Sequence, residues 1–151
     1  MFRMKMFACL ALLVIAIGCN STRKTFDVRV QNQTSQPVTV WLTKDGPPPE
    51  VEWYSPEQLG EMPNDTRARY DLAIVPPGKT GYTGKMTGEF PAGTRAVLRI
   101  YPGAMELFHI LEAAKTGGGQ HSDFVLKPGT NKLAVVDHGG GQLAVEPVGG
   151  R

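Results

Sequence analysis

The chain has 151 residues, of which 41% are hydrophobic and 20% are charged, so it is long enough for one globular domain and is not a disordered chain. It carries 16 basic and 14 acidic residues, and two of the basic ones, Arg3 and Lys5, precede an apolar run near the N-terminus. Without residues 1–18 the two kinds are equal at 14 each, which excludes a general electrostatic attraction to nucleic acid.

The N-terminal segment has the features of a secretory signal peptide. Residues 7–17 form a run of 11 apolar residues behind Arg3 and Lys5. The run is shorter than the ~20 residues that a membrane-spanning helix needs, and its length and positive flank are typical of a signal peptide. We therefore expect residues 1–18 to be cleaved. Cys9 would leave with them, so no disulfide is expected in the mature chain.

Residues Ala16, Ile17, Gly18 and Cys19 end this segment and resemble the lipobox of bacterial lipoproteins. The resemblance covers residues 1–19 alone. It implies that a lipid is attached to the Cys19 thiol and that a peptidase cuts between Gly18 and Cys19. Ala16 departs from the pattern, in which leucine is commoner at that position. Ordinary secretion through the small-x-small pair Ala16 and Gly18, and an uncleaved anchor, are the alternatives.

The resemblance predicts a cell-envelope protein that meets a membrane through the lipid on Cys19. Residues 19–24 then form a short tether, and residues 25–151 form the exported domain. Five extended residues span at most ~18 Å, which keeps the domain close to the membrane. Asn20 is not the aspartate that retains lipoproteins in the inner membrane of well-studied enteric bacteria. This favours the outer membrane in a Gram-negative organism.

Short strands separated by turn residues fill most of the remaining chain. Residues 25–31 and 38–42 alternate apolar and polar side chains and predict a hairpin of two half-buried strands. Residues 105–115 fit either a strand or a helix. Further strand patterns, separated by proline and glycine, lie at residues 70–74, 82–90, 95–101, 122–127, 131–137 and 143–148. Their number and spacing predict an all-β fold, a two-sheet antiparallel β-sandwich of about 7–9 strands with immunoglobulin-like or transthyretin-like architecture.

Residues 44–69 interrupt the strand pattern, and loops of this length are often functional. A short helix is expected near residues 55–61, because Ser55 can cap it, Pro56 suits its first position and Gln58 can complete a capping box. The aromatic residues of this loop and its borders form the candidate binding surface. If packed, they make a minor core, and if exposed, they can stack on sugar rings or dock a protein. They are Trp41, Trp53, Tyr54 and Tyr70.

Patterns that would indicate catalysis or a bound cofactor are weak. Residues 78–80 (GKT) resemble the end of a phosphate-binding loop, but Ala73 stands where that loop needs glycine. Residues 121–123 (HSD) hold the residue types of a hydrolase triad, but neighbours on a strand point to opposite faces. We therefore expect no catalytic residue, metal or cofactor. The histidines and nearby acids without metal-ligand spacing are His109, His121, His138, Asp123 and Asp137.

These features predict a lipid-anchored envelope protein that binds or assembles rather than catalyses. The first alternative is a carbohydrate-binding module that contacts cell-wall or surface glycans through exposed tryptophan and tyrosine side chains. A small hydrolase or metal protein is a remote alternative. The expected partners are the membrane and either an envelope protein or a glycan, with no nucleic acid.

Overall fold

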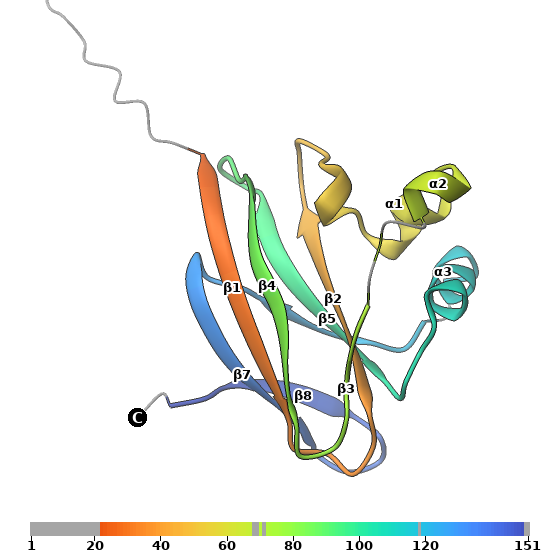
Figure 1. Ribbon diagram of the computed structural model, residues 1–151, viewed down its shortest axis with the longest axis vertical. Helices are drawn as coiled ribbons and strands as arrows, with labels where there is room; N and C mark the ends of the chain where they lie inside the picture. The colour runs from red at the N-terminus through yellow and green to blue at the C-terminus, as the bar shows by residue number, and fades with distance from the viewer. Residues whose placement is uncertain (1–21, 68–69, 71, 118, 150–151) are drawn as a thin grey trace, which may run out of the picture.

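Two four-stranded sheets pack face to face in the computed structural model, which describes residues 22–67, 70, 72–117 and 119–149 (Figure 1). Sheet A has the strand order β4-β1-β7-β8, and sheet B has the order β3-β2-β5-β6. The predicted two-sheet fold of seven to nine strands is confirmed. The strands are β1 (Arg23–Asn32), β2 (Val38–Asp45), β3 (Ala73–Val75), β4 (Thr80–Glu89), β5 (Arg95–Pro102), β6 (Ser122–Val125), β7 (Gly129–Asp137) and β8 (Leu143–Pro147).

The predicted pairing of the first two strands is wrong. β1 and β2 lie in different sheets, and the connection between them crosses from one sheet to the other. The buried side chain of Asn32 stabilises this crossing, because its amide nitrogen donates to the carbonyls of Gln36 (2.7 Å) and Val75 (2.9 Å). Its amide oxygen accepts from the Thr34 N–H at 2.9 Å. A buried amide with three partners holds the crossing connection in place.

Sheet A is mixed, so the expectation of an antiparallel sandwich is also wrong in part. β1 pairs antiparallel with β4 but parallel with β7, where Val30 lies opposite Leu133. Parallel neighbours cannot be joined by a tight hairpin, so the two strands come from distant parts of the chain.

Strand β1 itself begins at Arg23, two residues earlier than predicted, and the Phe90 N–H donates to the Thr22 carbonyl at 2.7 Å. The segment between Cys19 and the fold is therefore shorter than the predicted tether of residues 19–24.

The described residues form two hydrophobic clusters, one on each face of strand β2. The inner face of β2 contributes Val38, Val40 and Leu42 to the main core between the sheets. Its outer face carries Trp41, which is 2% exposed because helices cover it. The second cluster lies between sheet B and these helices and consists of Trp41, Leu59, Tyr101, Ile110 and Leu111.

Short helices occupy the long interruption and the ambiguous segment. Helix α1 (Pro56–Gly60) has the predicted capping box, in which the Ser55 hydroxyl accepts from the Gln58 N–H and the Gln58 side chain accepts from the Ser55 N–H. The predicted helix at 55–61 is confirmed. A 3₁₀ helix η1 (Val51–Trp53) and helix α2 (Asn64–Arg67) flank it. The ambiguous segment forms helix α3 (Leu107–Lys115), packed against α1.

One predicted strand differs clearly in its bounds, and the ambiguous segment is a helix for a physical reason. Strand β3 covers only residues 73–75, so Tyr70 lies outside it. In α3 the adjacent residues Ile110 and Leu111 are both buried, which a helix allows and a strand with one buried face does not. Among the described residues, no helix has the length and apolar character needed to cross a membrane.

A substitution at Gly88 tests how tightly η1 and the preceding residue Glu50 pack against strand β4. A Cβ atom at Gly88 would lie 2.6 Å from the Trp53 indole nitrogen and 2.7 Å from the Glu50 carboxylate. Gly88→Ala should therefore lower the free energy of unfolding by about 1–3 kcal/mol in a urea titration. The matched control is Gly60→Ala, whose added methyl would meet only the end of the Lys115 side chain, at 3.9 Å. Equal stability of the two variants would contradict this packing.

Candidate functional site

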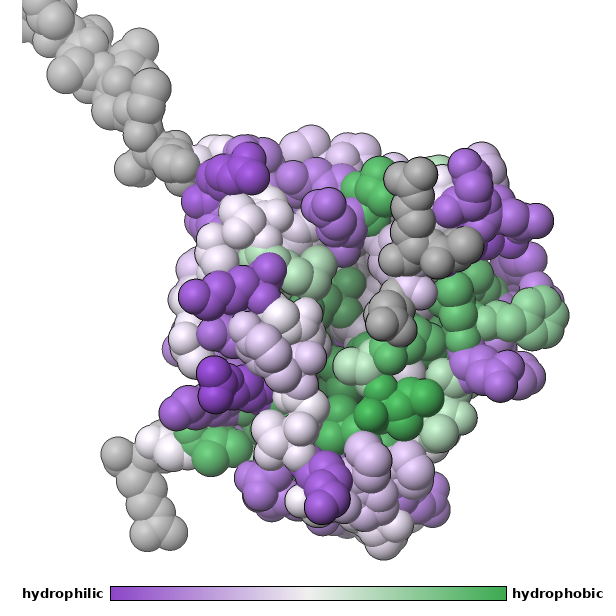
Figure 2. Space-filling view, in the orientation of Figure 1, coloured by the Kyte–Doolittle hydropathy of each residue, from purple (hydrophilic) through white to green (hydrophobic). Residues whose placement is uncertain are grey.

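An apolar groove of about 580 Å³ opens along one side of the sandwich, where β4 of sheet A faces β2 of sheet B. Strand β3 pairs only with residues 38–40 of β2, so no strand of the described chain closes the groove beyond that point. Figure 2 shows hydrophobic residues gathered to the right of centre on this face. The volume is within the usual range for ligand pockets. The lining residues are Val40, Trp41, Leu42, Val51, Glu52, Tyr70, Leu72, Thr83 and Met86.

A β-bulge in β4 brings two of its side chains into the groove. Asp27 lies opposite Lys85 and Arg29 lies opposite Tyr82, so one residue of β1 faces two residues of β4. The extra residue reverses the side-chain alternation, which lets Thr83 and, three residues later, Met86 line the same groove. Gly84 makes this possible, because its φ of +81° is strained for any residue with a side chain.

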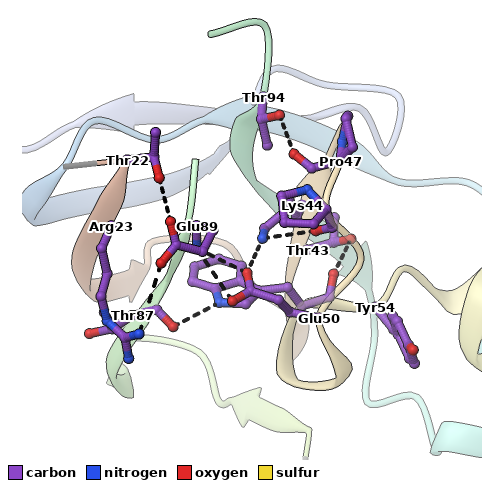
Figure 3. A network of polar contacts seen from close by, with 12 residues as sticks. Thr22, Arg23, Thr43, Lys44, Pro47, Glu50, Tyr54, Thr87, Glu89 and Thr94 are labelled. Carbon is purple, nitrogen blue, oxygen red and sulfur yellow. Dashed lines mark hydrogen bonds and ion pairs between the residues drawn. The ribbon is translucent and has the colours of Figure 1, made fainter. Parts of the chain in front are cut away.

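Trp53 attaches helix η1, which forms one wall of the groove, to both sheets. Its side chain is 1% exposed and packs edge-on against Phe26 and Phe90, with ring centroids 5.6 and 5.0 Å away. Its indole N–H donates to the Thr87 carbonyl on β4 at 3.3 Å, and its own carbonyl accepts from the Thr43 hydroxyl on β2 at 3.2 Å (Figure 3). Helix η1, which carries Val51 into the groove, is therefore held from two directions.

An ion pair between the buried Lys44 and the partly exposed Glu50, beside Trp53, makes the same connection (Figure 3). The Lys44 side chain is only 2% exposed, and its ammonium contacts the Glu50 carboxylate, the Pro48 carbonyl at 3.1 Å and the face of the Phe90 ring at 4.7 Å. Glu50 also accepts a hydrogen bond of 3.1 Å from the Glu89 N–H of β4. Removing the Glu50 carboxylate would leave the buried Lys44 ammonium without its ionic partner, which is destabilising.

Tyr70 and Trp41 form the wall of the groove opposite β4. Their rings stack with centroids 5.4 Å apart and planes 23° apart. The Tyr70 hydroxyl accepts from the Tyr54 N–H at 2.8 Å and donates to the Val51 carbonyl, and the Trp41 indole donates to the Tyr54 carbonyl at 2.9 Å. Burial raises the pKa of Tyr70 to about 12, so its hydroxyl remains a neutral donor at physiological pH.

The four aromatic residues predicted as a binding surface do not form one exposed cluster. Trp41 and Tyr70 line the groove, Tyr54 is half-buried between them and α1, and Trp53 belongs to the main core. Trp41 and Trp53 are at most 2% exposed, so neither offers an open indole face for a sugar ring. The packed arrangement is therefore the one that the structure has.

Sequence reasoning missed the residues that β4 contributes to the groove, and within the loop of residues 44–69, which it did identify, it did not single out the two that η1 contributes. These are Val51, Glu52, Thr83 and Met86. A signal for the β4 contribution was present, because a glycine inside a strand pattern often marks a bulge, and Gly84 interrupts the pattern of residues 82–90.

The triad-like residues 121–123 do not come together as a triad. His121 Nε2 lies 3.3 Å from an Asp123 oxygen, while the Ser122 hydroxyl donates to a β8 carbonyl at 2.6 Å instead of to the imidazole. Asp123 also lies 3.6 Å from Arg99, which donates to both Glu57 oxygens at 2.9 and 3.0 Å. This chain of charges ties α1 to strands β5 and β6, which is a structural role.

The other patterns weighed in the sequence have ordinary positions. Gly78 has a φ of +69°, and strand β4 follows from Thr80, so residues 78–80 are a turn before a strand and not a phosphate-binding loop before a helix. His109, His138 and Asp137 join no cluster of three or more metal-ligating side chains among the described residues. Cys19 and Gly18 lie outside the described residues.

The groove combines apolar walls with few polar groups, which suits binding better than proton transfer. Among its lining residues only Glu52 and Tyr70 are titratable. Comparison of the chain with protein-family models, with curated proteins and with solved structures finds no match. We therefore infer what the groove can bind from its own residues alone.

The Glu50 carboxyl makes the stability of this region depend on pH. Burial alone raises its pKa, but the hydrogen bonds from Lys44 and from the Glu89 N–H outweigh burial and leave the pKa below the ordinary value of 4.5. Since the unfolded chain then binds more protons, stability is present above the ordinary pKa and is lost as pH falls through the lower one.

We therefore expect the free energy of unfolding to decline as the pH is lowered from about 5 to about 3, and Glu50→Gln to make that decline shallower. Urea titrations across this range measure it. Part of the decline should remain in the variant, because hydrogen bonds, including that from Arg99, also lower the pKa of Glu57. Glu61→Gln, at an exposed position after α1, is the control. A slope unchanged by Glu50→Gln would contradict the role of the pair.

Proposed function

We propose that this chain is a lipid-anchored cell-envelope lipoprotein whose β domain is a non-catalytic binding or assembly module. The observation that supports binding is the apolar groove between β2 and β4. Anchorage rests on the apolar run at residues 7–17 and on the lipobox-like residues that end at Cys19. The immunoglobulin-like or transthyretin-like architecture remains a prediction beyond the two packed sheets.

The groove supports a binding role because its frame is rigid and its surroundings are apolar. The ion pair between Lys44 and Glu50, together with Trp53, holds the wall formed by η1 in place before any partner binds. Large hydrophobic side chains remain exposed on the same molecule, including Val51 at its rim (47%), Ile74 on β3 (46%) and Phe108 on α3 (66%). Of these, Val51 supports an interaction site because it is continuous with the groove, whereas single exposed side chains such as Phe108 are common on any protein surface. A protein partner fits it better than a glycan, since Trp41 and Trp53 are buried.

Anchorage at Cys19 would keep this groove near the membrane. Two residues, Asn20 and Ser21, separate Cys19 from Thr22, whose carbonyl already accepts a hydrogen bond from Phe90 of the fold. The three Cα–Cα steps from Cys19 to Thr22 span at most ~11 Å. The proposed partner is therefore an envelope protein within reach of the membrane surface. Asn20 favours the outer membrane if the organism is Gram-negative.

The two cysteines of the precursor allow a matched test of the lipid. With a radiolabelled fatty acid supplied to a bacterial host, we expect label in the wild-type protein and in Cys9→Ser, and complete loss of label in Cys19→Ser. Only Cys19→Ser should leave the membrane fraction or accumulate uncleaved. A cleaved Cys19→Ser protein that still sediments with membranes would show that lipidation at this residue is wrong.

A further inference from the structure

The free edge of β4 is partly covered by side chains that act in place of a neighbouring strand. The Thr87 carbonyl accepts from Trp53, and the Glu89 N–H donates to Glu50, so both groups point away from β1. The Thr25 and Thr87 hydroxyls lie 2.8 Å apart, as expected for a pair whose main-chain groups point away from each other. By the same alternation, the N–H and carbonyl of Lys85 also point to this edge.

Beside Lys85 no strand of the described residues pairs with this edge. Towards one end, Trp53 and Glu50 cover β4, and towards the other, Val75 of β3 packs so closely that a Cβ atom at Gly81 would lie 2.4 Å from it. Between these two contacts the described chain places no strand beside β4, and the apolar groove occupies that position. The gap spans residues 82–86, about 17 Å of strand.

The two faces of this gap differ in chemistry, which specifies what can fill it. Inward-pointing side chains would meet Met86 and, across the groove, Val40 and Leu42. Outward-pointing side chains would lie beside Lys85, which is exposed. On the next strand the half-buried Asp27 lies opposite Lys85 and the exposed Arg29 follows two residues later, so these three side chains carry a net positive charge. Opposite charges on neighbouring strands attract, so apolar residues are favoured inward and acidic residues outward.

We infer that the open edge of β4 binds an extended segment of a partner protein in which apolar and acidic residues alternate. The segment pairs with the main chain of Lys85 as a fifth strand of sheet A and places its apolar side chains in the groove. This mode of recognition takes affinity from main-chain hydrogen bonds and specificity from alternate side chains. The inference rests on the proposed function, since it names the partner chemistry of the same groove.

Two seven-residue peptides with blocked ends test it, one alternating valine with glutamate and the other alternating valine with lysine. Titration calorimetry on the full chain in detergent measures their affinities. Wild type should bind the glutamate peptide about tenfold more tightly than the lysine peptide, and Lys85→Glu should reverse the preference. The matched control is Lys115→Glu, which makes the same charge change at an exposed residue of helix α3, outside sheet A, and should shift the affinities less than about twofold.

A second variant separates this inference from the proposed function. Met86→Lys places a charge in the groove and should abolish binding of both peptides, with folding checked by circular dichroism. If Met86→Lys abolishes binding but Lys85→Glu leaves the preference unchanged, strand pairing is wrong and the groove stands as a contact surface. If a folded Met86→Lys protein binds as wild type does, the groove is not the site and both proposals fail. Failure of wild type to bind either peptide would overturn the inference alone.

Discussion

The ion pair between Lys44 and Glu50 is the interaction on which the open side of the sandwich depends. Lys44 lies on β2 in sheet B. Glu50 links it to sheet A, because its carboxylate accepts a hydrogen bond from the Glu89 N–H of β4. Both carboxylate and ammonium are also held by main-chain groups, which offsets part of the cost of removing them from water. The two sheets are therefore joined at a point where no strand links them, and η1 is held where it forms the wall of a groove.

Strand β4 carries three glycines that serve three different purposes in this arrangement. Gly81 lets Val75 approach, Gly84 forms the bulge, and Gly88 leaves space for Trp53 and Glu50. Together they allow one strand to be an edge, a groove wall and a docking surface for a loop. A bulge and an exposed lysine are also common protections against unwanted pairing at an edge, so a partner must match this edge in detail.

Local features of the fold were predictable from the sequence, and long-range ones were not. The capping box of Ser55 and Gln58 and the positions of most strands follow from short-range patterns. The partner of β1 does not, because alternation reveals which face is buried but not which strand lies alongside. The site was predictable only in part. The loop of residues 44–69 was identified, but the burial of Trp53 depends on Phe26 and Phe90, which lie far away in sequence.

The central claim is that side chains cover the outer end of β4 and leave its middle free. Amide hydrogen exchange compares the two positions within one strand, since the Glu89 N–H donates to Glu50 while the register directs the Lys85 N–H to the same edge, where no described strand pairs with it. The account predicts slow exchange at Glu89 and fast exchange at Lys85 in the protein without a partner. Exchange at Glu89 as fast as at Lys85 would show that Glu50 does not hold this edge, and would contradict the account.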